Sequence, residues 1–202
     1  MKRNLLSFAA LAAVLGASPI LAQAPAPLVG PNFQVNVGTQ GPQLDVDVAQ
    51  DSAGDTVFVW VDQGTAPQAV LARVYDPAGK PRGLSFIVGI ESQPMISHPR
   101  VAMTPLGELT VVWGNSHTIF VRRFDRLGQP LGSVSTTRQI PSDLFHSPDV
   151  AVDAAGNAVV VWAVSRFDGD LILLQRFNAA NQSPGFQGFS EVVNQNPVNS
   201  RD

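Results

Sequence analysis

Residues 148–162 read PDVAVDAAGNAVVVW, and this stretch decides the fold. Asp153 followed by Gly156 predicts a tight turn, because the carboxylate accepts backbone N–H groups and glycine takes the left-handed conformation that such a turn requires. The residues after the turn are apolar at nearly every position up to Trp162. A strand with one face in water would alternate between apolar and polar residues, so we expect this strand to be covered on both faces.

The same pattern occurs twice upstream, as VDVAQDSAGDTVFVW at 46–60 and PRVAMTPLGELTVVW at 99–113. In each copy a glycine precedes the tryptophan by six positions, and a Val-Ala pair stands before the turn. Downstream, an aromatic residue and a polar turn recur as YDPAG, FDRLG and FNAAN. Asn181 replaces glycine in the last of these turns, and asparagine tolerates the same backbone angles. The chain is therefore a tandem repeat.

Each copy divides into four apolar runs separated by turn signals, which predicts four antiparallel strands. In the first copy the runs are 44–50, 56–62, 69–76 and 84–89. Stacked small sheets cover a central strand on both faces, so we expect an all-β, propeller-like array of three four-stranded antiparallel blades. A β-sandwich is the alternative fold. The tryptophans are predicted to lie in the core. The expected units are 37–89, 90–138 and 139–194.

The pattern P-x-V-A-x-D-x-x-G-x-x-V-V-V-W at 148–162, the triplet Q-R-F at 175–177 and the stretch 189–194 resemble the repeats of bacterial secreted and cell-surface propeller-like arrays. The resemblance covers nearly the whole chain after the first thirty or so residues and is weaker in the first unit. It implies a fold and a compartment, and it implies no reaction.

The N-terminus predicts export. Lys2 and Arg3 precede an apolar run at 5–15, which is typical of a signal peptide. We expect the signal peptide to cover 1–22, a Pro-containing linker to cover 23–31 and the repeat domain to cover 32–202. The alternative is a retained anchor, although Gly, Ser and Pro interrupt the apolar run. The expected location is secreted, periplasmic or extracellular, with no membrane contact after cleavage. The chain has no cysteine, so disulfides and thiolate metal sites are excluded.

Composition argues against several functions. The net charge is −3 at pH 7 and the basic residues are not clustered, which argues against nucleic-acid binding. The sequence has no G-x-S-x-G nucleophile and no phosphate-binding glycine loop, so no catalytic residue or cofactor is predicted. The three histidines lack metal-ligand spacing, so no metal is predicted either. Four aspartates repeat at turn positions, which predicts hairpin caps and not a glycosidase pair: Asp51, Asp76, Asp125 and Asp153.

The ends of the repeat suggest that the array is incomplete. The string FQVN at 33–36 matches the fourth-strand endings at 86–89 and 191–194, so the domain is expected to begin with a fourth strand that has no earlier strands. Residues 199–202 resemble the loop that leads into a next unit. Two hypotheses follow: the chain is a truncated member of a longer array, or copies of it combine to close a ring by edge pairing of the leading strand.

The connection between the second and third strands varies in length among units, whereas the distance from the aromatic to the next proline is constant. Variation is thus concentrated at one edge, where binding loops are expected. We predict a binding or interaction module for a surface protein or glycan; the alternatives are an exported glycan-acting hydrolase and a structural array segment. Arg122 and Arg123 are expected to cover blade surface with their stems. The candidate contact residues lie in the loops of the variable edge: Asp62, Gln68, His98, Asn115, His117, His146, Arg166, Asp168 and Asp170.

Overall fold

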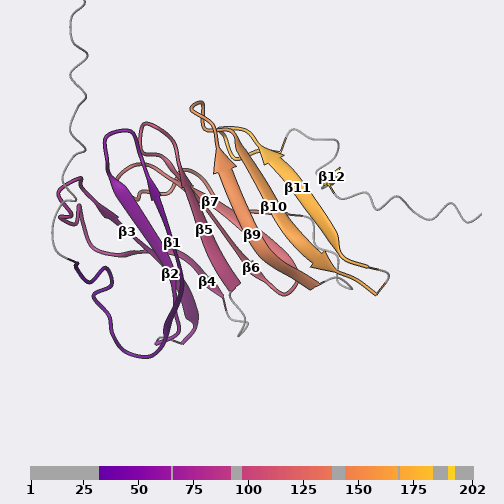
Figure 1. The fold of residues 1–202 in the computed structure, drawn as a ribbon, viewed down its shortest axis with the longest axis horizontal. Coiled ribbons are helices and arrows are strands. Elements are labelled where there is room, and N and C mark those ends of the chain that lie inside the picture. The colour runs from indigo at the N-terminus through magenta and orange to yellow at the C-terminus, as the bar shows by residue number, and fades with distance from the viewer. Residues whose placement is uncertain are drawn as a thin grey trace, which may run out of the picture.

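The computed structural model describes residues 32–64, 66–91, 97–137, 144–167, 169–183 and 191–193. The described part of the chain is all-β, and its strands form three antiparallel sheets. Figure 1 shows the sheets side by side along the long axis of the molecule. The predicted signal peptide and linker lie outside the described residues. Within those residues, no helix has the length and apolar character needed to cross a membrane.

Each sheet is a four-stranded meander in which strands pair with their neighbours along the chain. The prediction of an all-β chain with three antiparallel sheets is therefore confirmed, whereas a sandwich has two sheets. Sheet A contains β1 (Gln43–Gln50), β2 (Thr56–Asp62), β3 (Gln68–Tyr75) and β4 (Phe86–Glu91). Sheet B contains β5 (Ser97–Met103), β6 (Leu109–Asn115), β7 (Thr118–Phe124) and β8 (Ser135–Thr136). Sheet C contains β9 (Leu144–Val152), β10 (Ala158–Ser165), β11 (Leu171–Phe177) and β12 (Glu191–Val192).

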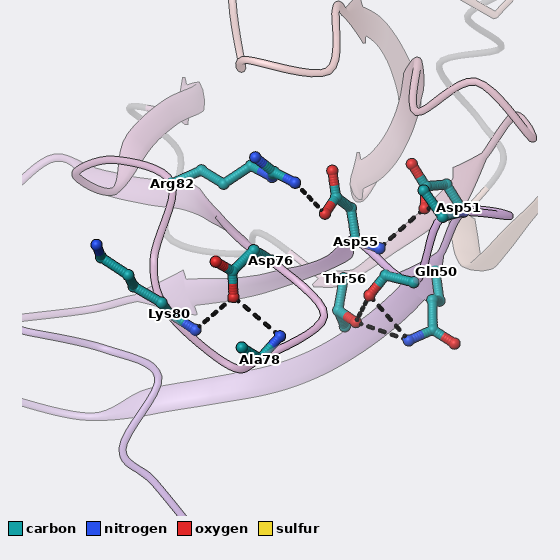
Figure 2. Close-up of polar contacts among 10 residues, drawn as sticks. Gln50, Asp51, Asp55, Thr56, Asp76, Ala78, Lys80 and Arg82 are labelled. Carbon is teal, nitrogen blue, oxygen red and sulfur yellow. Dashed lines mark hydrogen bonds and ion pairs between the residues drawn. The ribbon is translucent and has the colours of Figure 1, made fainter. Parts of the chain in front are cut away.

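The tight turns use the predicted aspartate chemistry. In the turn between β9 and β10, Oδ1 of Asp153 accepts the N–H of Ala155 at 2.9 Å and that of Asn157 at 2.8 Å. Figure 2 shows the equivalent bonds of Asp76 in sheet A. The predicted substitution of glycine by Asn181 is also confirmed, because this residue adopts a left-handed φ of 60°. The prediction of hairpin caps is confirmed for all four aspartates, each of which accepts two backbone N–H groups.

One cap makes stability depend on pH. A hydrogen bond from the side chain of Asn157, and then one from its backbone N–H, lowers the pKa of Asp153 below its ordinary value of 3.8. A carboxyl whose pKa is lower in the folded state contributes stability above its unfolded pKa and loses it as the pH falls through the folded pKa. Asp153→Asn keeps a side-chain oxygen that can accept both N–H groups, as Oδ1 of Asn178 does in the turn after β11, but the amide does not titrate. We expect wild type to lose more stability than this variant between pH 6 and pH 3, measured by urea unfolding. Equal losses would contradict the assignment.

Two hydrophobic clusters lie between the sheets, one between A and B and one between B and C. Strand β6 contributes to both: Val111 and Trp113 belong to the first cluster, and Val112 belongs to the second. All three side chains are buried, so the expectation of two covered faces is confirmed for β6. The prediction that the tryptophans are core residues is also confirmed, because all three are buried.

Strand β10 departs from that expectation. Its burial alternates, with Val160 and Trp162 buried against sheet B and Val159 37% exposed on the opposite face. The prediction of two covered faces was therefore wrong for this strand. The physical reason is its place in the stack, since no described sheet follows sheet C.

The leading segment 33–36 was expected to be a strand, and the structure places it in irregular backbone. It nevertheless packs on sheet A. The ring of Phe33 lies 5.0 Å from that of Tyr75, and the carbonyl oxygen of Val35 accepts hydrogen bonds from Tyr75 Oη at 2.7 Å and from Arg73 Nη1 at 3.1 Å.

Strand β4 makes the corresponding contacts with sheet B. The ring of Phe86 lies 5.1 Å from that of Phe124, and the carbonyl oxygen of Val88 accepts a hydrogen bond from Arg122 Nη1 at 2.7 Å. The sequence match between 33–36 and 86–89 therefore corresponds to a shared position in the stack. The leading segment occupies on sheet A the place that β4 occupies on sheet B.

The two arginines of β7 are interface residues. Arg122 bonds to β4 of sheet A, whereas Arg123 is 1% exposed and donates to the carbonyl oxygens of Asn178 and Ala179 in sheet C at 3.1 and 2.7 Å. The stems were expected to cover blade surface, and the structure places both arginines between blades, with the guanidinium of Arg123 buried. Sheet B has a neighbour on each face, so successive side chains of β7 both point into an interface.

Candidate functional site

The connections between second and third strands and the starts of β1, β5 and β9 lie at one edge, which we call the loop edge. Gln43 pairs with Asp62 in sheet A, and Leu144 pairs with Ser165 in sheet C, so both kinds of connection reach this edge. The edge continues from sheet to sheet, because the N–H of Phe145 donates to the carbonyl oxygen of Ser116 at 2.8 Å.

In sheet A the predicted residues support the loop itself. Asp62 is buried, and its Oδ1 accepts the N–H of Gly64 at 2.8 Å and the side-chain amide of Gln43 at 2.9 Å. Gln68 begins β3 and is half-buried. The carboxylate of Asp62 is thus engaged in holding the connection, and only a small part of its surface is left for a ligand.

In sheet B, Oδ1 of Asn115 accepts the N–H of His117 at 3.0 Å, which closes a short turn and leaves the histidine exposed. His98 was expected in a loop, and the structure places it within β5. Its Nδ1 lies 3.5 Å from Oδ1 of Asp45 in sheet A. Asp45 was not predicted from the sequence, because nothing in the local pattern indicates that it lies opposite a histidine of the next unit.

In sheet C, His146 was also expected in a loop and lies within β9, where its Nε2 is 3.0 Å from Ser165 Oγ. Arg166 and Asp170 are exposed in the connection between β10 and β11, and Asp168 lies outside the described residues. The same connection carries Phe167, which is fully exposed. Phe167 was not predicted as a contact residue because it is not polar, although an aromatic residue in a loop of variable length indicates one.

The loop edge is thus a row of polar residues, with two of the predicted residues in sheet A and three each in the described parts of sheets B and C. Across the described residues, no group of three or more His, Asp or Glu side chains is arranged to hold a metal ion. The three histidines do not come together as a metal site would require.

The opposite edge, which we call the turn edge, is built from the tight turns. Asp55 is buried there and lies 2.5 Å from Arg82 (Figure 2). This hydrogen bond raises the pKa of Arg82. Asp51 and Asp76 are held by backbone N–H groups, so all three carboxylates have structural partners.

A cavity of about 530 Å³ opens at the turn edge of sheet C. Its lining includes Asp153, Asn157 and Arg176 together with apolar atoms of Val159 and Phe177. Its position is at the end of the stack, on the sheet whose far face is uncovered.

Comparisons with protein-family models and with curated proteins gave no match for this chain.

Proposed function

We propose that the protein is a secreted binding module, that its three sheets are blades of a propeller-like array, and that its loop edge contacts a protein or glycan of a cell surface. The difference between the two edges carries this proposal. Turns at the turn edge repeat one arrangement, in which an Asp, Thr or Asn is followed three positions later by a residue with a left-handed φ. Connections at the loop edge differ in length, at 63–67, 116–117 and 166–170. A rigid sheet stack with variable loops at one edge is the usual arrangement of a binding scaffold.

Phe167 is the side chain best placed to carry binding energy. It is fully exposed, so it contributes no burial to the fold. Arg166 precedes it and is also exposed. Aromatic residues and arginine are enriched at interfaces, and a few such residues supply most of the binding energy there. We therefore place the centre of the contact surface on the connection between β10 and β11.

Phe167→Ala is expected to weaken binding at least about tenfold, since loss of an aromatic anchor typically costs more than about 1.4 kcal/mol. Ligands are first identified with glycan arrays and immobilised cell-surface proteins, and affinities are then measured for both variants. Leu106→Ala is the matched control, because Leu106 is an exposed apolar residue at the turn edge. It should bind as wild type does. Equal affinities for Phe167→Ala and wild type, or equal losses in both variants, would refute the loop-edge assignment.

A further inference from the structure

The far face of sheet C is apolar and exposed. Val159 and Val161 of β10 point to this face, because Val160 and Trp162, which alternate with them, pack against sheet B. Their partners in β11 are Arg176 and Leu174, which share the same face. Ile172 of β11 lies in the same row and is exposed. We call these five residues the C face.

The same repeat positions are interfaces in the other two sheets. Counting from the tryptophans, Val159 and Val161 correspond to Val57 and Val59 of β2, which are fully buried where sheet A meets sheet B. In β7 the counterparts of the β11 residues are buried where sheet B meets sheet C: Ile119, Val121 and Arg123. The C face is therefore the surface that a following sheet covers twice elsewhere in this chain.

One carboxylate beside the C face, that of Asp149, follows the repeat. Oδ2 of Asp47 in β1 accepts the N–H of Val101 in the next sheet at 2.9 Å. Asp149 holds the same repeat position in sheet C and lies on its far side. The carboxylate of Asp149 would thus be placed to accept a backbone N–H of an incoming sheet, as that of Asp47 accepts one from sheet B.

The arginines follow the repeat as well. Arg176 stands where Arg123 stands in sheet B, and Arg123 donates to the turn that follows β11. The cavity at the turn edge is lined by Arg176 and lies where such a turn of a following sheet would dock. Arg176 of the C face and Asp149 beside it thus hold the repeat positions that make polar contacts between sheets elsewhere in the chain.

The matching face lies at the other end of the stack, on the side of sheet A away from sheet B. Val46 and Val48 of β1 are 67% and 52% exposed. Their counterparts on β5 are Pro99 and Val101, which are buried against sheet A. We call Val46 and Val48 the A face. Each end of the stack therefore lacks the first three strands of a neighbouring sheet, and the other end has them. The leading segment 33–36 already holds the fourth-strand place on sheet A, so β12 of an incoming copy must displace that segment to keep the register.

We propose that the C face of one copy binds the A face of a second copy, head to tail. The second copy is the occupant because this contact continues the interface that already joins sheets A to B and B to C, with the same register of apolar, carboxylate and arginine positions. Such a heterologous contact produces a ring if its rotation closes and a filament if it does not. The inference goes beyond the proposed binding function, because the loop edges of both copies stay uncovered.

The test uses two variants, each with one damaged face. Val159→Glu places a charge on the C face, and Val48→Glu places one on the A face. Light scattering of the purified whole chain should show multimers for wild type and single chains for each variant. An equimolar mixture should form dimers, because each variant still carries one intact face complementary to the intact face of the other.

Leu84→Glu is the control, since Leu84 is exposed and lies on neither face. It should assemble as wild type does, and thermal unfolding should show that all variants are folded. A wild-type chain that stays monomeric at the highest attainable concentration would overturn the proposal. A mixture of the two variants that stays monomeric would overturn it too. Assembly that persists in Val48→Glu but is lost in Val159→Glu would also overturn it, because that result would indicate that two C faces pair. Ligand binding at Phe167 is measured separately. A chain that does not assemble would therefore refute the head-to-tail contact without refuting ligand binding at the loop edge.

Discussion

Gly89→Ala is expected to lower the free energy of unfolding by about 3 kcal/mol, at the upper end of the usual cost of overpacking a core. A Cβ on Gly89 would lie 2.8 Å from Cε2 of Trp113 and would overlap Cζ2 as well. The indole cannot move aside, because it is buried between sheets A and B and stacked on Phe120 at 5.3 Å. Urea unfolding of the purified variant measures the loss.

Gly83→Ala is the matched control. A Cβ at Gly83 meets no atom within 4 Å, so this variant should be as stable as wild type or slightly more stable. A double-mutant cycle with Trp113→Phe tests the cause, because phenylalanine withdraws the part of the indole that a Cβ at residue 89 would overlap. The cost of Gly89→Ala should then fall by about 2 kcal/mol, as non-additivity between contacting residues predicts. A cost that is unchanged by Trp113→Phe would show that strain in β4, and not the ring, is responsible.

Local chemistry made the turns predictable from the sequence. Each turn depends only on neighbouring residues: an aspartate accepts two N–H groups, and the residue three positions later takes a left-handed φ. This is why Asp153 and Asn181 behave as expected. Burial of the central strands was less predictable. The strings around Trp113 and Trp162 are similar, yet β6 is covered on both faces and β10 on one, because their places in the stack differ.

The candidate site was the least predictable part. Asp62 was predicted as a contact residue because it is polar and lies at the loop edge. Its carboxylate instead accepts hydrogen bonds from Gly64 and Gln43, which hold the connection after β2 in place. His98 was predicted on the same grounds, without its neighbour Asp45, which lies in another unit. Contacts between units depend on how the sheets stack, and spacing within one unit does not encode that. Phe167 was overlooked for a different reason, since only polar residues of the variable loops were considered. Its place in such a loop is readable from the sequence, whereas its full exposure is a property of the fold.

Arg123→Ala is expected to destabilise the protein by about 3 kcal/mol, because hydrogen bonds to a charged donor are worth about 1.5–3 kcal/mol each and the change also leaves a cavity. The guanidinium is buried, and Nη1 holds the carbonyl oxygens of Asn178 and Ala179, which fixes the turn of sheet C against sheet B. Glu108 lies 3.7 Å from Nη2 and is half exposed, so it adds little. Chemical denaturation at low protein concentration measures the change.

Arg176→Ala is the matched control, because Arg176 holds the same repeat position on the exposed C face, and its loss should cost under about 0.5 kcal/mol. Arg123→Met separates the hydrogen bonds from the volume of the side chain. Methionine fills part of the space and donates nothing, so this variant should lie between wild type and Arg123→Ala. Burying a guanidinium also costs solvation energy, and a buried charge replaced by an apolar side chain can leave stability unchanged or raise it. If Arg123→Met is as stable as wild type, that cost outweighs the two hydrogen bonds, and the arginine positions the sheets without stabilising them.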